Sequence, residues 1–310
     1  MASHGDAAET DHAGAGGASY AIRVTTPELT KIVARLDGVP VPPTLGLLRP
    51  DDLGVLRGDG VFETTLAVGG MPRDLDEHLA RMQASARMMD LDLPAPEDWQ
   101  PAIRTVLAGW TGGPEMVLRL IATRGPEDGG VPTCYVIGSA LAESAVAARQ
   151  GIKVLLLDRG FHGADVAAKP WLLVGAKSLS YAMNMAAGRY ARSHGADDVI
   201  FTDTDGSVLE GPTSTVVLAR DRNLVTPPRE GILDGITARR LLQAAESAGW
   251  STSVQPVSAD ELRSADALFL TSSTRILAPI VSIDGTARDN DAAIVQELAR
   301  LLQVPGAQGA

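Results

Sequence analysis

The sequence has few of the residues that build several common kinds of protein site. Its 310 residues include one cysteine, Cys134, so no disulfide can form within the chain. The five histidines are scattered, with no His-x-x-x-His pair, and we therefore expect no zinc site and no other metal. No apolar run reaches the roughly 20 residues that a membrane-spanning helix needs. These absences argue against a disulfide framework, a Cys/His metal centre and a membrane protein.

The chain is also poor in positive charge. It has 27 Lys and Arg residues against 38 Asp and Glu residues, a formal net charge of −11, which disfavours non-specific binding to nucleic acid. Hydrophobic residues make up 45% and charged residues 21%, as in ordinary globular proteins. Residues 1–17 lack the basic and apolar segments of a signal peptide. We expect a soluble cytoplasmic protein whose ligand, if anionic, is bound by a few local arginines.

The length predicts two domains after a short arm. Residues 1–18 are rich in Ala, Gly, Asp and His and are expected to be disordered. Residues 19–142 form the predicted smaller α+β domain, and residues 143–310 form the larger C-terminal domain. Apolar patterns and turn residues predict strands at 61–68, 116–122, 134–137, 151–157 and 267–271, and helices at 76–90, 179–194 and 237–248. A hairpin is predicted across the Asp205-Gly206 turn, with arms at 199–202 and 208–217.

Lys177 follows an apolar run and precedes a helical pattern. Burial at such a position would lower the pKa of the amine, which favours Schiff-base chemistry. The alternative is a lysine that simply extends into solvent, which is the common outcome after a strand.

Glu210 lies at an apolar strand end, beyond the Asp205-Gly206 turn. A carboxylate there is costly unless it has a cationic partner, and a protonated pyridine nitrogen would be one. It could instead lie at the rim of the turn. The spacing of the neighbouring aspartates does not match a calcium loop.

Three further segments suit a phosphate group. Residues Gly235, Ile236 and Thr237 open a predicted helix, whose first N–H groups can bind an anion. The Thr271–Ser273 segment supplies hydroxyls, and Arg81 can add a charged clamp. Each feature alone is equally typical of helix caps and turns.

These segments occur in an order that resembles the class IV (fold type IV) pyridoxal-phosphate enzymes. The family includes branched-chain aminotransferases, D-amino-acid aminotransferases and aminodeoxychorismate lyases. The resemblance covers about residues 21–285. The motifs that carry it are Gly58-Asp59-Gly60-Val61-Phe62-Glu63-Thr64, Glu77-His78-Leu79-x-Arg81, Lys177-Ser178-Leu179, Leu209-Glu210-Gly211, Leu233-x-Gly235-Ile236-Thr237 and Thr271-Ser272-Ser273.

The resemblance implies a two-domain α+β homodimer with pyridoxal 5′-phosphate in the interdomain cleft. It implies that Lys177 forms the Schiff base with the cofactor and moves the proton, and that Glu210 keeps the pyridine nitrogen protonated. It places the cofactor phosphate on Arg81, Ser273 and the N–H groups of Ile236 and Thr237. Tyr181 matches a tyrosine that hydrogen-bonds the phenolic oxygen of the cofactor in branched-chain enzymes, although it could equally be a core aromatic.

The substrate pocket must separate the members of the family, because they share the cofactor chemistry. Residues 58–63 resemble the lyase and D-amino-acid branches, while the loop 123–132 lacks the Arg-x-His pair with which the D-amino-acid branch binds carboxylate. Ser180 and Tyr181 depart from the lyase pattern. The leading interpretation is an aminodeoxychorismate lyase that releases pyruvate and 4-aminobenzoate for folate synthesis. The alternative is a branched-chain or D-amino-acid aminotransferase. A non-catalytic protein is disfavoured because Lys177 and Glu210 are both present.

The substrate of such a lyase is a small molecule with two carboxylates, so the pocket needs fixed cations. The candidate residues for substrate binding are Arg57, Phe62, Arg119 and Arg124. Arg119 and Arg124 are five positions apart, so on a regular strand they face opposite sides, and at most one is expected to point into the pocket. Each of the three arginines could instead form a surface ion pair.

Overall fold

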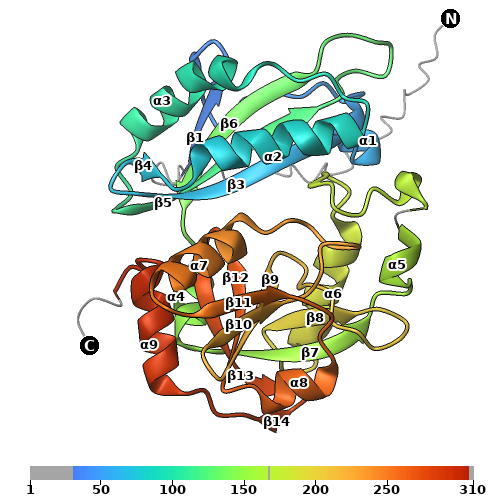
Figure 1. Ribbon diagram of the computed structural model, residues 1–310. Helices are drawn as coiled ribbons and strands as arrows, with labels where there is room; N and C mark the ends of the chain where they lie inside the picture. Colours follow the sequence, from blue (N-terminus) through green and yellow to red (C-terminus); the bar gives the residue numbers. More distant parts are fainter. Residues whose placement is uncertain (1–30, 167, 307–310) are drawn as a thin grey trace, which may run out of the picture.

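A computed structural model describes residues 31–166 and 168–306, so the predicted arm at 1–18 lies outside the described residues. The described chain forms two sheets that lie one above the other in Figure 1. Residues 31–140 build the first sheet and residues 152–287 the second. The predicted domain boundary at 142/143 falls in the connection between them.

The first sheet is antiparallel, with strand order β2-β1-β6-β5-β3-β4 in the described residues. Long pairing between its central strands fixes the register, with Gly60 opposite Thr123 and Val68 opposite Glu115. The elements of this first half of the chain are β1 (Lys31–Arg35), β2 (Pro40–Val41), α1 (Leu53–Arg57), β3 (Gly60–Val68), β4 (Met71–Pro72), α2 (Leu75–Met88), a 3₁₀ turn (Pro96–Trp99), α3 (Gln100–Gly109), β5 (Glu115–Thr123) and β6 (Thr133–Ala140).

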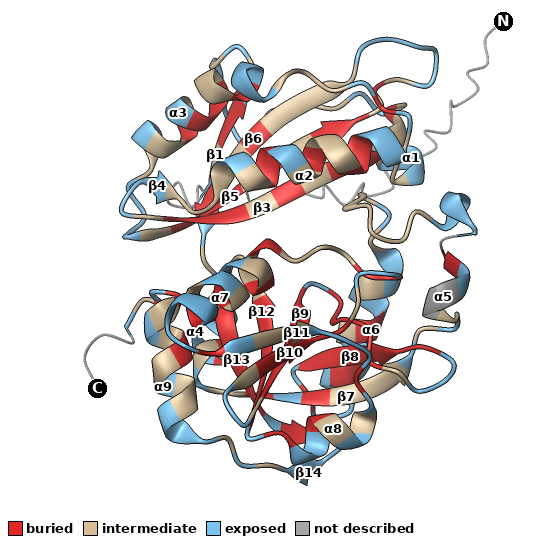
Figure 2. Cartoon of the chain, viewed as in Figure 1, coloured by how far each residue is buried: buried red, intermediate tan, exposed pale blue. Residues whose placement is uncertain are grey.

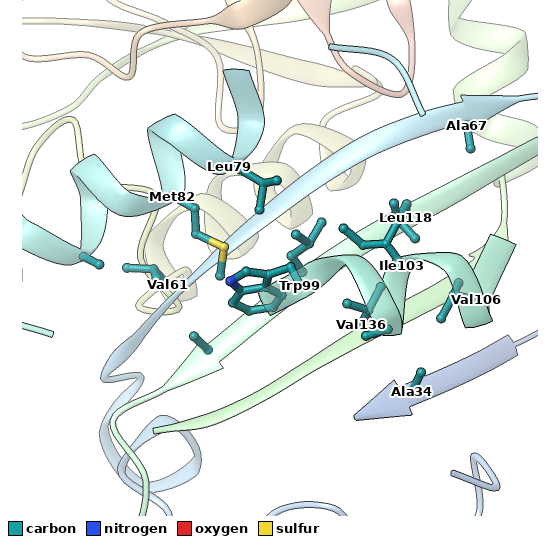
Figure 3. Close-up of a cluster of buried hydrophobic side chains, with 14 of the residues drawn as sticks. Ala34, Val61, Ala67, Leu79, Met82, Trp99, Ile103, Val106, Leu118 and Val136 are labelled. Carbon is teal, nitrogen blue, oxygen red and sulfur yellow. The ribbon is translucent and has the colours of Figure 1, made fainter. Parts of the chain in front are cut away.

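Helices α2 and α3 pack on one face of this sheet (Figure 1). The apolar side chains of α2 recur at helical spacing, and the strands alternate between two faces, so both present an apolar surface to the same layer. Figure 3 shows Leu79 and Met82 of α2 beside Trp99, with Ile103 of α3 beside Leu118 of β5. This layer holds α2 firmly over β3, and both elements carry residues of the site.

The second sheet is mixed, with order β11-β10-β9-β12-β13-β7-β8 in the described residues and β14 paired to β13. Strands β8 and β12 are almost wholly buried, as the red strands of Figure 2 show. The elements of this second half of the chain are α4 (Glu143–Ala147), a 3₁₀ turn (Ala148–Gln150), β7 (Ile152–Asp158), α5 (Gly163–Val166), a 3₁₀ turn (Pro170–Leu172), α6 (Ala182–Ser193), β8 (Asp198–Thr202), β9 (Thr215–Arg220), β10 (Asn223–Thr226), α7 (Ile236–Ser247), β11 (Ser251–Val254), α8 (Ala259–Ser264), β12 (Ala267–Ser272), β13 (Ile276–Ile283), β14 (Thr286–Ala287) and α9 (Ala292–Leu301).

Two predicted elements differ in detail from the structure. Helix α6 begins at Ala182, three residues later than predicted. The hairpin across Asp205-Gly206 pairs only as far as Glu210, whose carbonyl accepts from the Phe201 N–H at 2.8 Å. The chain then turns, and β9 pairs with β10 and β12 instead of β8, because those neighbours bury it on both sides.

The segment around Lys177 returns from the second sheet to the edge of the first. The Phe62 N–H donates to the Lys177 carbonyl at 3.0 Å, and the Leu179 N–H donates to the Gly60 carbonyl at 2.8 Å. Gly60 has no space for a side chain, because an added Cβ would lie 2.4 Å from the Ala122 carbonyl oxygen. The lysine is therefore anchored to β3. None of the helices in the described ranges has the length and apolar character to cross a membrane.

Candidate active site

A cavity of about 320 Å³ lies between α2 of the first half and several loops of the second. Its volume suits a small organic ligand. The structure brings to it all seven residues that the sequence predicts for the cofactor, namely Arg81, Lys177, Tyr181, Glu210, Ile236, Thr237 and Ser273.

Lys177 lines this cavity and lies beside two aromatic rings. Its Nζ lies 4.5 Å from the ring centre of Phe62 and 5.8 Å from that of Tyr181. The Lys177 N–H donates to Ser85 Oγ of α2 at 3.0 Å, which fixes the backbone from a third side. Burial, together with repulsion from Arg81, lowers the pKa of the amine to about 8, against attraction from Glu63 and Glu210. Near physiological pH a much larger fraction of this amine is therefore neutral, and nucleophilic, than of an ordinary lysine.

Glu210 lines the same cavity and is buried. Its Oε1 accepts from Nη1 of Arg159 at 2.8 Å, and its Oε2 accepts from the Leu233 N–H at 3.0 Å. Burial raises the pKa of Glu210, and Arg159, the Leu233 N–H and Lys177 oppose that rise. The Arg159 guanidinium lies over the rings of Phe161 and Phe201. Glu210 is thus a fixed carboxylate that can attract a proton-bearing ring nitrogen.

A candidate binding site for an anion lies at the start of α7. Its N-cap residue, Gly235, makes no side-chain cap, so the first N–H groups remain open to a ligand. A Cβ at Gly235 would lie 2.1 Å from Thr215 Oγ1, so only glycine fits beside this strand. Ser214 Oγ is buried without a hydrogen-bond partner among the described residues, and Ser214 also lines the cavity.

Arg81 reaches this end of the cavity from α2 and is held by Glu63 of β3. Its Nε donates to Oε1 at 2.6 Å and its Nη2 to Oε2 at 2.8 Å, while Nη1 donates to the Asp234 carbonyl at 2.7 Å. Burial opposes ionisation of Glu63, but Arg81 and a hydrogen bond with His78 outweigh it and lower the pKa of Glu63 to about 2. His78 Nε2 lies 3.4 Å from Ser273 Oγ, so this buried network continues to a predicted phosphate ligand.

Tyr181 lies at the start of α6, with its ring edge-on to Phe62 at 5.3 Å. Its hydroxyl donates to the Pro212 carbonyl at 3.0 Å. Burial and the charge of Glu210 raise the pKa of this phenol to about 12, so it is a neutral donor.

The four residues predicted for substrate binding lie outside the lining of the cavity. Phe62 nevertheless contacts Lys177, and Arg119 lies on the same face of the first sheet because its cross-strand partner is Thr64, two residues from Phe62. Arg124 is engaged elsewhere, with Nε bound to Asp59 at 2.7 Å and Nη2 to the Met89 carbonyl at 2.7 Å. Arg57 is exposed at the end of α1.

Several residues of the site have no predicted role, among them Glu63 and Arg159. Glu63 stands within the first family motif, and strand alternation places it on the buried face with Val61 and Thr65. His78 and Arg81 are three positions apart and so share one face of the predicted helix. Two basic side chains on that face could have indicated a buried acidic partner such as Glu63. Arg159 follows β7 directly, and nothing in the local sequence marks it as the partner of Glu210.

The donor set of the cavity fits pyridoxal phosphate. It offers a buried amine of lowered pKa for an aldehyde, a buried carboxylate for the ring nitrogen, and N–H, hydroxyl and guanidinium donors for a phosphate. The orphaned Ser214 hydroxyl is a feature that a bound anion would explain.

The family model of class IV amino-transferases matches residues 60–283. The chain belongs to this family. Its members depend on pyridoxal phosphate, so the predicted cofactor, the enzymatic nature of the chain and the fold type IV architecture are confirmed.

Three relatives are similar over most of their length. The bifunctional aminodeoxychorismate lyase / D-amino acid transaminase of Mycobacterium tuberculosis is 40% identical over 265 residues, which is 82% of this chain and 92% of that protein. The pyridoxal-phosphate-bound form of a hypothetical aminotransferase from the same organism superposes with a TM-score of 0.85 at 40% identity, covering 88% of this chain and 97% of the other. A fold IV transaminase from Curtobacterium pusillum gives 0.83 at 40% identity, with the same coverage.

Proposed function

We propose that this protein is an aminodeoxychorismate lyase that releases pyruvate and 4-aminobenzoate for folate synthesis. The observation that carries the proposal is the 40% identity, over most of both chains, with the bifunctional lyase and transaminase of M. tuberculosis. The name of that relative also favours a second activity, D-amino-acid transamination. The cofactor, when bound, supplies an electron sink for either reaction.

We assign the proton transfer to Lys177. Its anchored backbone holds Nζ beside Phe62 and Tyr181, and a pKa of about 8 lets the amine accept and return a proton near neutral pH. Glu210 holds a proton on the ring nitrogen, because its buried carboxylate is fixed by Arg159 and the Leu233 N–H. Tyr181 is assigned a place beside the reacting amine, with its ring centre 5.8 Å from Lys177 Nζ; its hydroxyl must leave the Pro212 carbonyl to donate to the cofactor.

We assign the cofactor phosphate to Arg81, Ser273 and the N–H groups of Ile236 and Thr237. The support is their common position at one end of the cavity, with Arg81 oriented by Glu63. The substrate carboxylates are assigned to Arg119 and the face around Phe62, because Arg124 is bound to Asp59 and Arg57 is exposed.

We also propose that the protein is a homodimer, as its resemblance to the family implies, and that it works in the cytoplasm. Large apolar side chains stand exposed beside the cavity, among them Trp171 at 72% and Met185 at 51%, and such patches commonly mark interfaces. Light scattering of the purified chain measures the oligomeric state, and a monomer would contradict this assignment.

A product assay tests the lyase. The cofactor-loaded protein is given aminodeoxychorismate without an amino acceptor, and equal amounts of pyruvate and 4-aminobenzoate are expected over many turnovers. The Lys177→Ala variant is the control and should form neither. If the wild-type protein shows the visible band of lysine-bound cofactor but forms no product, the lyase is wrong and the aminotransferase becomes the leading function. A panel of D- and L-amino donors with a keto-acid acceptor then follows.

A further inference from the structure

The hairpin turn between β12 and β13 carries the hydroxyls at the anion end of the cavity. Ser272 and Ser273 line the cavity, and the chain reverses through Thr274 and Arg275 into β13. Ile276 follows with φ of 65°, and the Leu277 N–H donates to the Arg275 carbonyl at 2.9 Å. This is a γ-turn with a positive central φ, a strained conformation for a β-branched residue. Such strain persists only where the surroundings enforce it, and often at functional sites.

Arg149 binds this turn on the side away from the cavity. It belongs to the connection between the two sheets, its side chain is 5% exposed, and it does not line the cavity. Its Nε donates to the Arg275 carbonyl at 3.3 Å and its Nη2 to the Thr274 carbonyl at 3.2 Å. The first of these is the same carbonyl that closes the γ-turn.

The same guanidinium binds the first sheet. Nη2 lies 2.6 Å from Oε1 of Glu115 and Nη1 lies 3.1 Å from Oε2, a bidentate pair with the first residue of β5. One side chain thus joins the first sheet, the interdomain connection and the turn that presents Ser273.

Arg275 fixes the turn on its other side. Its Nη1 donates to Asp198 Oδ2 of β8 at 2.6 Å, and its own N–H donates to Ser272 Oγ at 3.3 Å. The Ile276 side chain is 1% exposed and packs in the core with Phe269 and Leu298, so the strained residue cannot rotate outward. These contacts hold the turn, and with it the two serines, from both sides.

We propose that Arg149 is a positioning residue for the anion end of the active site. It stabilises the strained turn at Ile276, and through Glu115 it ties the placement of Ser273 to the first sheet, which supplies Arg81. The inference rests on the proposed role of Ser273 in binding the cofactor phosphate.

The test compares two ligands that differ only in the phosphate. The full-length apoprotein, as wild type and as Arg149→Met, is titrated with pyridoxal 5′-phosphate and with pyridoxal. The quantity compared is the ratio of the dissociation constant for pyridoxal to that for pyridoxal phosphate. We expect the variant to lose about tenfold in affinity for pyridoxal phosphate, the effect of one or two lost hydrogen bonds from a charged group. Affinity for pyridoxal should change less than about twofold, so the ratio falls.

Two controls separate positioning from general stability. Arg288→Met removes another half-buried arginine, which donates to the Ile280 and Ala265 carbonyls away from the cavity, and should lower Tm without changing the ratio. Arg149→Lys keeps a charge beside Glu115 but cannot reach both carbonyls of the turn, so the ratio should fall in this variant too. It serves as the test if Arg149→Met does not fold.

A wild-type ratio in the folded Arg149 variants would overturn the positioning role while leaving the phosphate site intact. If the wild-type protein itself binds pyridoxal as tightly as pyridoxal phosphate, the phosphate assignment of Ser273 fails, and the inference falls with it.

Discussion

Glu63 and Arg81 form a bidentate ion pair between strand β3 and helix α2, with N···O distances of 2.6 and 2.8 Å. The glutamate is fully buried and the arginine lines the cavity. The pair therefore fixes the direction of the cation that we assign to the cofactor phosphate. The stability of the first sheet and its helices therefore also depends on whether the Glu63 carboxyl is ionised.

Replacing Glu63 with Gln should lower the free energy of unfolding by about 3 kcal/mol at neutral pH, because the Arg81 charge loses its buried partner. The pKa of Glu63 is about 2, below its ordinary value of 4.5, so its contribution is complete above that ordinary value and is lost as the pH falls toward 2. Urea unfolding of both proteins at several pH values measures the difference. A difference that stays constant between pH 6 and pH 3 would contradict this account. Glu77→Gln, at an exposed carboxylate paired with Arg239, is the control and should change little.

The reaction of the Lys177 amine with an aldehyde should have a lower pH midpoint than that of an ordinary lysine. Only the neutral amine reacts, and burial lowers its pKa to about 8 from 10.5. The rate at which apoprotein gains the visible band of bound pyridoxal phosphate should therefore rise with pH and level off above about 8. Stopped-flow absorbance measures it. Lys177→Ala should show no band, whereas Lys169→Ala, at an exposed lysine paired with Asp165, should behave as wild type. A midpoint near 10 would refute the burial argument.

Substitution of Glu210 by Gln should leave cofactor binding largely intact and reduce turnover. A neutral amide keeps the shape of the side chain but has only one oxygen for the two donors, Arg159 and the Leu233 N–H, and it no longer favours a proton on the ring nitrogen. We expect kcat to fall by about 100-fold, the scale of removing one electrostatic group from an active site. Steady-state kinetics and cofactor retention after dialysis check it, with exposed Glu230→Gln as the control. Unchanged turnover would remove Glu210 from the mechanism.

Arginine substitutions distinguish the candidates for binding substrate carboxylates. Arg119→Met should raise KM for a dicarboxylate substrate about tenfold with little change in kcat, as expected for loss of one charged hydrogen bond. Arg57→Met should leave KM unchanged because that side chain is exposed outside the cavity. Arg124→Met should chiefly lower Tm, since it removes the contact with Asp59. If Arg57→Met alone raises KM, the assignment to Arg119 is wrong.

Much of the fold follows from local sequence. The apolar runs over 61–68 and 116–122 and the helical spacing over 76–90 predict β3, β5 and α2 to within about two residues, because each pattern reflects buried side chains. The family motifs predict the cofactor and seven residues that line one cavity. These residues are recognisable because their chemistry demands particular side chains at particular turns and helix ends.

Other features depend on contacts between segments far apart in the chain. The sequence places Lys177 after an apolar run, but only the folded chain shows that it is anchored to β3 through Phe62 and enclosed enough to lower its pKa. The pairing of Glu210 with Arg159 and the hold of Arg149 on the Ile276 turn join residues 51 and more than 120 positions apart. Hydrophobic period and turn chemistry are local and can be read along the chain. Desolvation, ion-pair geometry and backbone strain arise only when distant segments pack together, so the tertiary structure decides them.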